Sequence, residues 1–518
     1  MRFHLPKGMA RAVTLAVVLA LPLAYVAPAQ ADPGPSALAR AVKIKDIVQH
    51  LEEFQRIADA HGGTRASGTP GYDASRDYVA GKLREAGYKV RIQPFEFPFF
   101  IEKATAVLQR IVPDPRTFTP TPPDGSAVGD FATMTYSGAG NITADVQSVD
   151  LQLPPPDVPG STSGCEPADF AGFTPGNIAL IQRGSCDFRV KAENAQAAGA
   201  VGVIIFNEGQ AGRTATVQGT LGRPAVTIPV VGASFEAGQQ LAADDTVVRL
   251  ATNTESDTRT TYNVIADSPS GDPRNVVMFG AHLDSVTAGP GINDNGSGSA
   301  GILETALTLS KLTTVNKLRF AWWGAEELNL LGSRHYVANL SPAERSKIKA
   351  YLNFDMIASP NPVYRIYDGD DSDGTGAPAG PPGSAEIEAL FQRYFDGLGV
   401  PHSGTDFDGR SDYGPFIEAG IPAGGLFTGG EGIKTEEEAE LYGGVAGLAY
   451  DPCYHRACDT ISNISKRALH YNTGAIVYAA VTYGYARRLP GAPNAATAAA
   501  APPAAQAGMD SWYHRLTR

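Results

Sequence analysis

The feature that most constrains the fold is a series of short apolar runs that end in polar, metal-ligating residue types. In the second half of the chain, NVVMFGAHL, KLRFAWWG and KAYLNFDMI each end in, or lead directly into, His, Glu or Asp. Continuous apolar runs of this length are typical of strands buried on both faces of a parallel sheet. Helical stretches such as SAGILETALTLSKL alternate with them. The pattern therefore predicts an α/β fold, with a mainly parallel mixed sheet and helices on both faces.

Five imidazole and carboxylate side chains fall at or near the ends of these runs. In an open α/β sheet, ligands bind beyond the carboxyl ends of the strands, so we expect the five to meet at one edge. Nitrogen and oxygen donors of this kind are ligands that zinc takes, and one bridging carboxylate suits two ions that share a water. The predicted metal ligands are His282, Asp294, Glu327, Asp355 and His455.

Several of these residues also have a plainer interpretation. His282 could be a satisfied histidine at a strand end, and Asp294 could belong to a solvated Asn/Asp-Gly turn. Asp284 follows His282 by two residues on extended backbone, so its carboxylate could hold the second ring nitrogen of that histidine. Asp355 lies inside an apolar run, where an unpaired charge would be costly. The plainer interpretation is therefore weakest for Asp355.

Glu326 and Glu327 form an acidic pair directly after the apolar run RFAWW. Adjacent side chains point in different directions, so one can bind metal while the other takes a proton from the attacking water. The alternative is an ordinary exposed acidic pair. Tyr454, beside His455, could donate a hydrogen bond to the oxyanion of the scissile carbonyl, or it could be a packed loop aromatic.

The first 31 residues have the arrangement of a signal peptide. Arg2, Lys7 and Arg11 precede an apolar stretch that is too short for a membrane anchor, and a small-residue cleavage site follows near Ala31. Cleavage would change the formal net charge from −12 to about −15, because three positive charges leave with the segment. We therefore expect a secreted, acidic protein with no stable membrane anchor and no affinity for nucleic acid.

The four cysteines of an exported chain suggest two disulfides. Their spacing favours two local pairs, Cys165–Cys186 and Cys453–Cys458. Free thiols are the alternative. A cysteine metal site is disfavoured because the chain has no C-x-x-C pair. The second disulfide would close a small loop around Tyr454 and His455.

The composition divides the chain of 518 residues into segments. After the signal peptide at 1–31, we expect one discontinuous domain at 36–131 and 255–488, because a β-rich segment with short strands interrupts it at 132–254. An Ala/Pro-rich tail at 489–518 is low in complexity and predicted to be disordered. Within the first part, VKIKDIVQHLEEFQRIADAHGG and TPGYDASRDYVAGKLREAGY have apolar residues at helical spacing and predict two helices, and KVRIQPFEF after them predicts a strand. The segment HGGTRASGTPGYDAS between the helices is a glycine-rich loop. It lacks the Lys-Ser/Thr ending of a phosphate-binding loop.

Two resemblances add to these observations. The segment GNIALIQRGSCDFRVKAENAQAAGAVGVIIFNE resembles a protease-associated domain, which supports the pair Cys165–Cys186 and implies a role in capping or substrate selection. The ligand constellation, in this order, resembles secreted bacterial double-zinc aminopeptidases, particularly leucine-preferring ones. This second resemblance covers nearly the whole mature chain apart from the tail.

The aminopeptidase resemblance implies a role for each polar residue. Asp294 would bridge the two zinc ions and Glu326 would be the general base. FDGRSDYGPFIEAGIPAGGLFTGG resembles the substrate-pocket region, which places Arg410 near the substrate and Tyr454 at the oxyanion. The implied ligand sets are His282, Asp294 and Asp355 for one zinc, and Glu327, Asp294 and His455 for the other.

Together these inferences predict a secreted, monomeric metallo-aminopeptidase with two zinc ions per chain. It would remove N-terminal residues, preferentially large hydrophobic ones such as leucine, from peptides with a free N-terminus. The alternatives are a carboxypeptidase of the same fold, a glutaminyl cyclase, and a non-catalytic peptidase-like binding protein. An aminopeptidase should leave N-terminally blocked peptides intact, which separates it from a carboxypeptidase.

Overall fold

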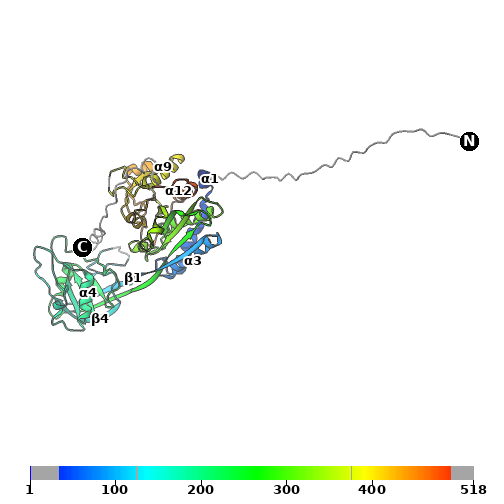
Figure 1. Cartoon of the computed structure of the whole chain (residues 1–518). Coiled ribbons are helices and arrows are strands. Elements are labelled where there is room, and N and C mark those ends of the chain that lie inside the picture. Colours follow the sequence, from blue (N-terminus) through cyan, green and yellow to red (C-terminus); the bar gives the residue numbers. More distant parts are fainter. Residues whose placement is uncertain (2–33, 124–126, 375, 492–518) are drawn as a thin grey trace, which may run out of the picture.

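The structure, a computed structural model, describes residues 1, 34–123, 127–374 and 376–491. Figure 1 shows two lobes, a larger one that holds the blue and the yellow-to-red parts of the chain and a smaller, mainly cyan one. The predicted signal peptide, apart from Met1, and the predicted tail from residue 492 onward lie outside the described residues.

A mixed sheet forms the centre of the larger lobe. Its strands are β8 (Val247–Asp267), β9 (Asp272–His282), β10 (Asn316–Trp323), β11 (Ile348–Phe354), β12 (Arg365–Tyr367), β13 (Ser403–Thr405) and β14 (Ala423–Phe427). Their order across the sheet is β13-β12-β14-β11-β9-β10-β8. The central strands β14, β11, β9 and β10 are mutually parallel, whereas β8 and β12 pair antiparallel with their inner neighbours. The predicted mainly parallel mixed sheet is confirmed.

Helices cover both faces of this sheet. They are α1 (Pro35–Ala41), α2 (Ile44–Ala60), α3 (Pro70–Glu85), α6 (Gly298–Leu309), α7 (Leu331–Ala338), α8 (Pro342–Arg345), α9 (Ser384–Leu398), α10 (Gly414–Glu418), α11 (Glu436–Tyr442) and α12 (Lys466–Tyr485). Alternate residues of a strand point to opposite faces. Accordingly, Phe279 of β9 packs into the core shared with α2, α6 and α12, whereas Met278 packs with Tyr336 of α7 and Phe416 of α10.

Between residues 44 and 112, the sequence pattern predicts which elements form, but it does not predict how long each one is. The two helices expected from apolar residues at helical spacing are α2 and α3. The strand predicted from KVRIQPFEF is β1, but it spans Lys89–Val112 and is much longer than that segment. It extends because it pairs antiparallel with β8 from Lys89 opposite Asp267 to Val112 opposite Val247.

The smaller lobe contains the remaining strands and two helices. Its elements are β2 (Arg116–Thr117), β3 (Phe131–Thr133), β4 (Gly140–Val149), the short 3-10 turn η1 (Pro167–Phe170), β5 (Ile178–Gln182), α4 (Phe188–Ala197), β6 (Gly202–Phe206), β7 (Val230–Ala233) and α5 (Phe235–Leu241). The strands follow in the order β4-β5-β6-β7-β3, and β4 pairs with the far half of β8. The predicted cysteine pairs are confirmed, Cys165 with Cys186 in this lobe and Cys453 with Cys458 in the larger one.

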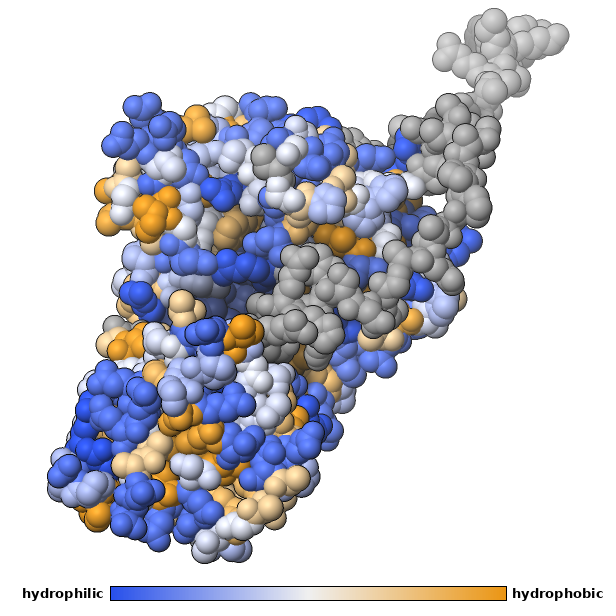
Figure 2. Space-filling view, turned by 90° about the vertical axis from the view of Figure 1, so that its left-hand side faces the viewer, coloured by the Kyte–Doolittle hydropathy of each residue, from blue (hydrophilic) through white to orange (hydrophobic). Residues whose placement is uncertain are grey.

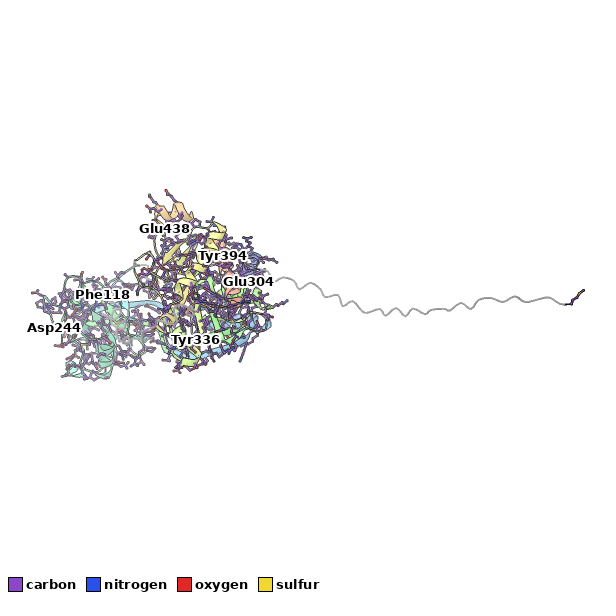
Figure 3. The ribbon with its side chains drawn as sticks, turned by 45° about the horizontal axis from the view of Figure 1, so that its top comes forward. Phe118, Asp244, Glu304, Tyr336, Tyr394 and Glu438 are labelled. Atoms are coloured by element: carbon purple, nitrogen blue, oxygen red, sulfur yellow. A yellow bond between two sulfur atoms is a disulfide. The ribbon has the colours of Figure 1, made fainter. Side chains whose placement is uncertain are left out.

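The strands β1 and β8 pass from one lobe into the other as a single antiparallel ribbon. Beyond the crossing, Leu108 of β1 and Phe118 pack with Leu180 and Ile204 of the smaller lobe. Figure 3 places Phe118 and Asp244 in this lobe, well apart from Tyr336 and Tyr394. The core of the smaller lobe therefore includes residues that precede its predicted start at 132.

The surface is mostly hydrophilic on the face shown in Figure 2, with small apolar patches scattered among charged and polar residues. The described helices include none that is both long enough and apolar enough to cross a membrane.

Candidate metal centre

Each predicted metal ligand lies at the carboxyl edge of the central strands or in a loop that reaches it. His282 is the last residue of β9, and Asp355 directly follows β11. Asp294 lies in the buried turn η2 (Ile292–Ser297), and Glu327 lies in the 3-10 turn η3 (Glu326–Leu328) that follows β10. His455 comes from the loop before α12. Five segments between residues 282 and 455 thus bring their side chains to one place.

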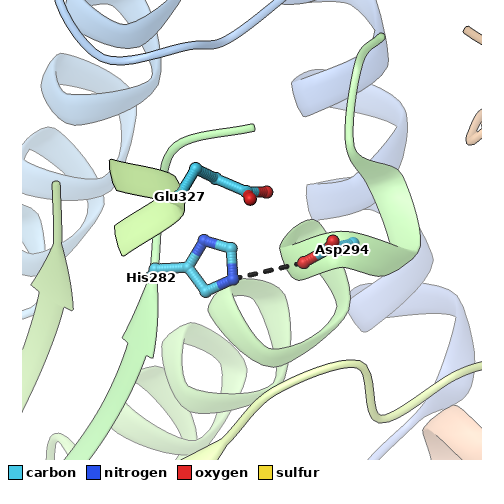
Figure 4. A group of neighbouring side chains, drawn as sticks. All are labelled: His282, Asp294 and Glu327. Carbon is cyan, nitrogen blue, oxygen red and sulfur yellow. Dashed lines mark ion pairs between the residues drawn. The ribbon is translucent and has the colours of Figure 1, made fainter. Parts of the chain in front are cut away.

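Asp294 lies at the middle of this group. Its Oδ1 atom lies 3.2 Å from Nε2 of His282, and its Oδ2 atom lies 3.2 Å from Nε2 of His455. Figure 4 shows Asp294 and His282 facing each other, with Glu327 beside them. Asp355 Oδ1 is 3.3 Å from His282 Nε2, and Glu327 Oε2 is 3.0 Å from His455 Nε2. The contacts of Asp294 therefore divide into a side with His282 and Asp355 and a side with His455 and Glu327. The closest three-residue groups in this site both include His282, one with Asp294 and Glu327 and the other with Glu326 and Asp355.

Two oxygen atoms in this site are buried without hydrogen-bond partners among the described residues, Oε1 of Glu327 and Oδ1 of Asp355. Leaving a buried carboxylate oxygen unsatisfied is costly, so such atoms usually face a ligand. Carboxylates and imidazoles are the donor set that zinc prefers. The residues present therefore fit a metal ion.

Several buried carboxylates and two histidines lie close together in this site, and burial and mutual charge change their pKa values. Burial raises the pKa of Glu326 and raises that of Glu327 to about 7. Burial alone would lower the pKa of His282, but the charges of Glu326 and Asp355 outweigh it and raise that pKa. Burial alone would also lower the pKa of His455, but hydrogen bonds to Asp294 and Glu327 outweigh that effect and raise the pKa to about 10. The site favours a positive charge at its centre.

Neighbouring residues contact the predicted ligands and fix their orientation. His282 Nδ1 lies 3.0 Å from the backbone oxygen of Asp284 and 3.7 Å from its carboxylate. The backbone carbonyl is the closer partner, and Oδ1 of Asp284 also accepts a hydrogen bond from the Glu326 amide (3.3 Å). The Asp284 carboxylate therefore contacts the turn that carries the two glutamates.

Two further residues contact the ligands and were not singled out in the sequence. The Ser411 hydroxyl donates to Oδ2 of Asp355 (2.6 Å). Asp459 accepts hydrogen bonds from the backbone amides of Asn293 and Asp294, which fixes the turn η2. Ser411 directly follows Arg410 in the predicted pocket segment, but a lone serine gives no local signal for such a role.

Tyr454 and Arg410 lie at the mouth of the site. The Tyr454 ring stacks on the His455 ring at 3.8 Å between centroids. Arg410 donates to the Tyr454 hydroxyl oxygen (3.2 Å) and forms an ion pair with Glu431 (2.8 Å). All the predicted site residues except Asp284 and the cysteines line one cavity of about 90 Å³. Other residues lining it are Met356, Tyr367, Thr405, Asp406, Asp408, Ser411, Phe427, Gly430 and Glu431.

Comparison with known proteins places this arrangement in a family. Residues 263–480 match Peptidase family M28, and residues 149–241 match the PA domain. An aminopeptidase of Pseudomonas aeruginosa is 50% identical over 447 residues, which cover 86% of this chain and 81% of that protein. Leucine aminopeptidase 2 of Trichophyton tonsurans is 42% identical over 463 residues, 88% of this chain and 87% of that protein.

Solved structures agree. An aminopeptidase from Aneurinibacillus sp. strain AM-1 superposes with a TM-score of 0.59 at 26% identity, covering 89% of this chain and 98% of that one. A zinc aminopeptidase from Bacillus subtilis superposes with a TM-score of 0.55 at 25% identity, covering 87% and 97%. Because it is 50% identical to a relative over an alignment that covers 86% of this chain and 81% of that protein, this chain belongs to peptidase family M28, as an aminopeptidase that carries an inserted PA domain.

Proposed function

We propose that this protein removes N-terminal residues from peptides with a free N-terminus by attack of water at a centre of two zinc ions. The observation that carries the proposal is the position of Asp294, whose two carboxylate oxygens each lie 3.2 Å from a different histidine. A carboxylate shared in this way suits a bridge between two cations. The choice of zinc is supported by the zinc aminopeptidase from Bacillus subtilis, which shares the fold.

The contacts on the two sides of Asp294 give the proposed ligand sets. His282, Asp294 and Asp355 would hold one zinc, and Asp294, Glu327 and His455 would hold the other. Zinc bound in these sets would lower the pKa of the attacking water and polarise the scissile carbonyl. The buried unpartnered oxygens of Glu327 and Asp355 support both sets.

The proton transfers fall to the protein. Glu326 would accept a proton from the attacking water as the new C–O bond forms, and would deliver it to the leaving nitrogen as the C–N bond breaks. The Tyr454 hydroxyl would donate a hydrogen bond to the oxyanion. Its proton is free for that purpose, because the Tyr454 oxygen accepts from Arg410.

The cavity lining supports a preference for large hydrophobic N-terminal residues. Met356, Tyr367 and Phe427 present apolar surface near the ligands. Asp406 lines the same cavity, and its carboxylate favours a cationic N-terminal residue as a second substrate class. Amide substrates that carry leucine or lysine compare the two preferences directly.

The test is hydrolysis of paired leucyl substrates with free and acetylated N-termini, by zinc-loaded and chelator-treated protein. We expect cleavage of the free form only, loss of activity on chelation, and recovery when zinc is restored. Cleavage of the acetylated peptide from its carboxyl end would favour the carboxypeptidase alternative. Inactivity of zinc-loaded protein towards leucyl, lysyl and other aminoacyl anilides would favour the non-catalytic binding protein.

The remaining expectations concern the chain as a whole. We propose that residues 1–31 direct export, that the mature protein is monomeric, that the insert at 132–254 forms the smaller lobe together with the residues of β1 and β2 that precede it, and that the tail begins at 489. Two disulfides among the described residues support an oxidising destination. Mass spectrometry of protein from the culture medium would test the cleavage near Ala31.

A further inference from the structure

The loop between α2 and α3, residues 61–69, contains a charged residue that the catalytic proposal does not use. Arg65 has no exposed surface. Arginine is almost never fully buried unless it is paired. Among the described residues no carboxylate lies within ion-pair distance of its guanidinium. Other contacts must therefore compensate for the cost of burying this charge.

Three backbone carbonyls surround the guanidinium. Arg65 donates from Nη1 to Leu283 O (2.5 Å), from Nε to Pro290 O (2.8 Å) and from Nη2 to Gly291 O (2.6 Å). Leu283 directly follows His282, and Gly291 directly precedes the turn η2 that carries Asp294. One rigid group therefore ties together the two ends of the loop that joins these two ligands.

The neighbours of Arg65 extend the same contact surface. The Arg65 amide donates to Ser285 Oγ (3.0 Å), and the Thr64 hydroxyl donates to Val286 O (2.9 Å). On the other side, Ser67 Oγ accepts a hydrogen bond from the amide of Ala325 (2.7 Å), next to Glu326. The loop thus contacts the segments that carry His282, Asp294 and the two glutamates.

Arg65 also contributes a permanent charge behind the carboxylates. Burial lowers the pKa of Arg65 to about 10, while the nearby charges of Asp284, Asp459 and Asp294 oppose that change. The side chain therefore stays protonated at neutral pH. Its guanidinium lies 4.9 Å from the centre of the Phe54 ring, which packs against the group without accepting a conventional hydrogen bond.

We infer that Arg65 is a positioning residue of the metal centre, which sets the separation of His282 and Asp294 by clamping the carbonyls of Leu283, Pro290 and Gly291. The inference rests on the proposed two-zinc function. Lysine cannot replace arginine here, because a single ammonium lacks the planar fork that reaches three carbonyls at once. The glycine-rich loop 61–69, which lacks the sequence of a phosphate-binding loop, would thus hold the predicted metal ligands in position.

The test compares Arg65→Lys with the matched control Arg319→Lys. Arg319 also donates through a planar fork, to both oxygens of Asp267, but it lies in the first half of β10, whereas the site follows the carboxyl end of that strand. For Arg65→Lys we expect zinc affinity to fall at least tenfold and kcat at least tenfold, with KM within threefold. The visible spectrum of the cobalt-substituted enzyme should also change. Arg319→Lys should lower Tm but leave zinc affinity, kcat and the cobalt spectrum as in the wild type.

Wild-type zinc affinity and kcat in Arg65→Lys would overturn the inference, as would equal losses in both variants. Zinc titration separates this result from failure of the proposed function, since an inactive wild type that still binds two zinc ions leaves the affinity comparison intact. If Arg65→Lys does not fold, Ser285→Ala removes one of the loop's hydrogen bonds. It should weaken zinc binding in the same direction by a smaller factor, and unchanged binding would contradict the clamp.

Discussion

Glu326 and Glu327 are neighbours in the chain, yet their carboxylates face different partners. Glu327 Oε2 lies 3.0 Å from His455, whereas Glu326 Oε2 lies 3.8 Å from His282. We expect Glu326→Gln to lower kcat by roughly 10²–10⁴-fold, because the amide cannot accept the proton of the water. Its zinc content, measured by atomic emission, should remain at the wild-type value. The partner variant Glu327→Gln should instead lose zinc, and zinc loss in Glu326→Gln would mean that the two roles are exchanged.

Asp406 carries the charge that we expect to attract a cationic N-terminal residue. Its carboxylate lines the cavity together with Met356 and Phe427. Removing the charge in Asp406→Asn should lower kcat/KM for lysyl p-nitroanilide by roughly fivefold, which corresponds to ~1 kcal/mol of ion pairing in a partly exposed site. The value for leucyl p-nitroanilide should stay within twofold. Equal changes for both substrates would place Asp406 outside the side-chain pocket.

Lys191 in the insert predicts a pH dependence. Its amine is buried and donates to Ser163 O (2.5 Å), and burial lowers its pKa to about 8. Below pH 8 the folded and unfolded chains are both protonated, and the folded protein bears the full cost of burial. Between pH 8 and roughly 10.5 only the unfolded chain holds the proton, so this residue's contribution to stability rises with pH, by ~3 kcal/mol in total. In Lys191→Met this rise should be absent when Tm is compared with the wild type from pH 7 to 10.5.

The loop closed by Cys453 and Cys458 carries Tyr454 and His455. His455 has a left-handed backbone conformation (φ 57°), which an unconstrained loop would rarely hold. We expect Cys453→Ser/Cys458→Ser to lower zinc occupancy and to reduce kcat/KM at least tenfold, because the ligand loses its fixed position. The control Cys165→Ser/Cys186→Ser should keep both values, since that disulfide lies in the other lobe. Unchanged zinc occupancy in the first variant would show that the loop is held by its other contacts.

The elements also show what local sequence can and cannot predict. His282 and Asp355 were predictable because each ends an apolar strand, and the parallel sheet brings such ends together. The length of β1 was not, because its far half is extended by pairing with β8, about 150 residues away in the chain. Arg65 was invisible for the same reason, since its three acceptors lie 218 to 226 residues further on. Contacts of this range leave no periodic pattern in a single sequence.

The insert can be removed from the chain at a defined point of the β1–β8 ribbon. Glu102 and Thr254 face each other across the β1–β8 ribbon. Joining them through Asn-Gly would close a two-residue hairpin and delete residues 103–253. We expect the shortened protein to fold, to bind zinc and to hydrolyse leucyl p-nitroanilide within fivefold of the wild-type rate, because the cores of the larger lobe contain no residue from the deleted segment. Loss of zinc binding on excision would show that the insert is needed to form the centre.

The ribbon that joins the lobes restricts how this protein can change during evolution. A flexible linker tolerates the gain or loss of single amino acids, whereas two paired strands have a fixed register. A one-residue deletion near Pro98, without a matching deletion near Thr258 opposite it, would turn every later side chain of β1 towards the wrong face. Lineages that alter the length of one strand must therefore alter the other, or absorb the difference as a bulge like the one already present between Glu102 and Ala104.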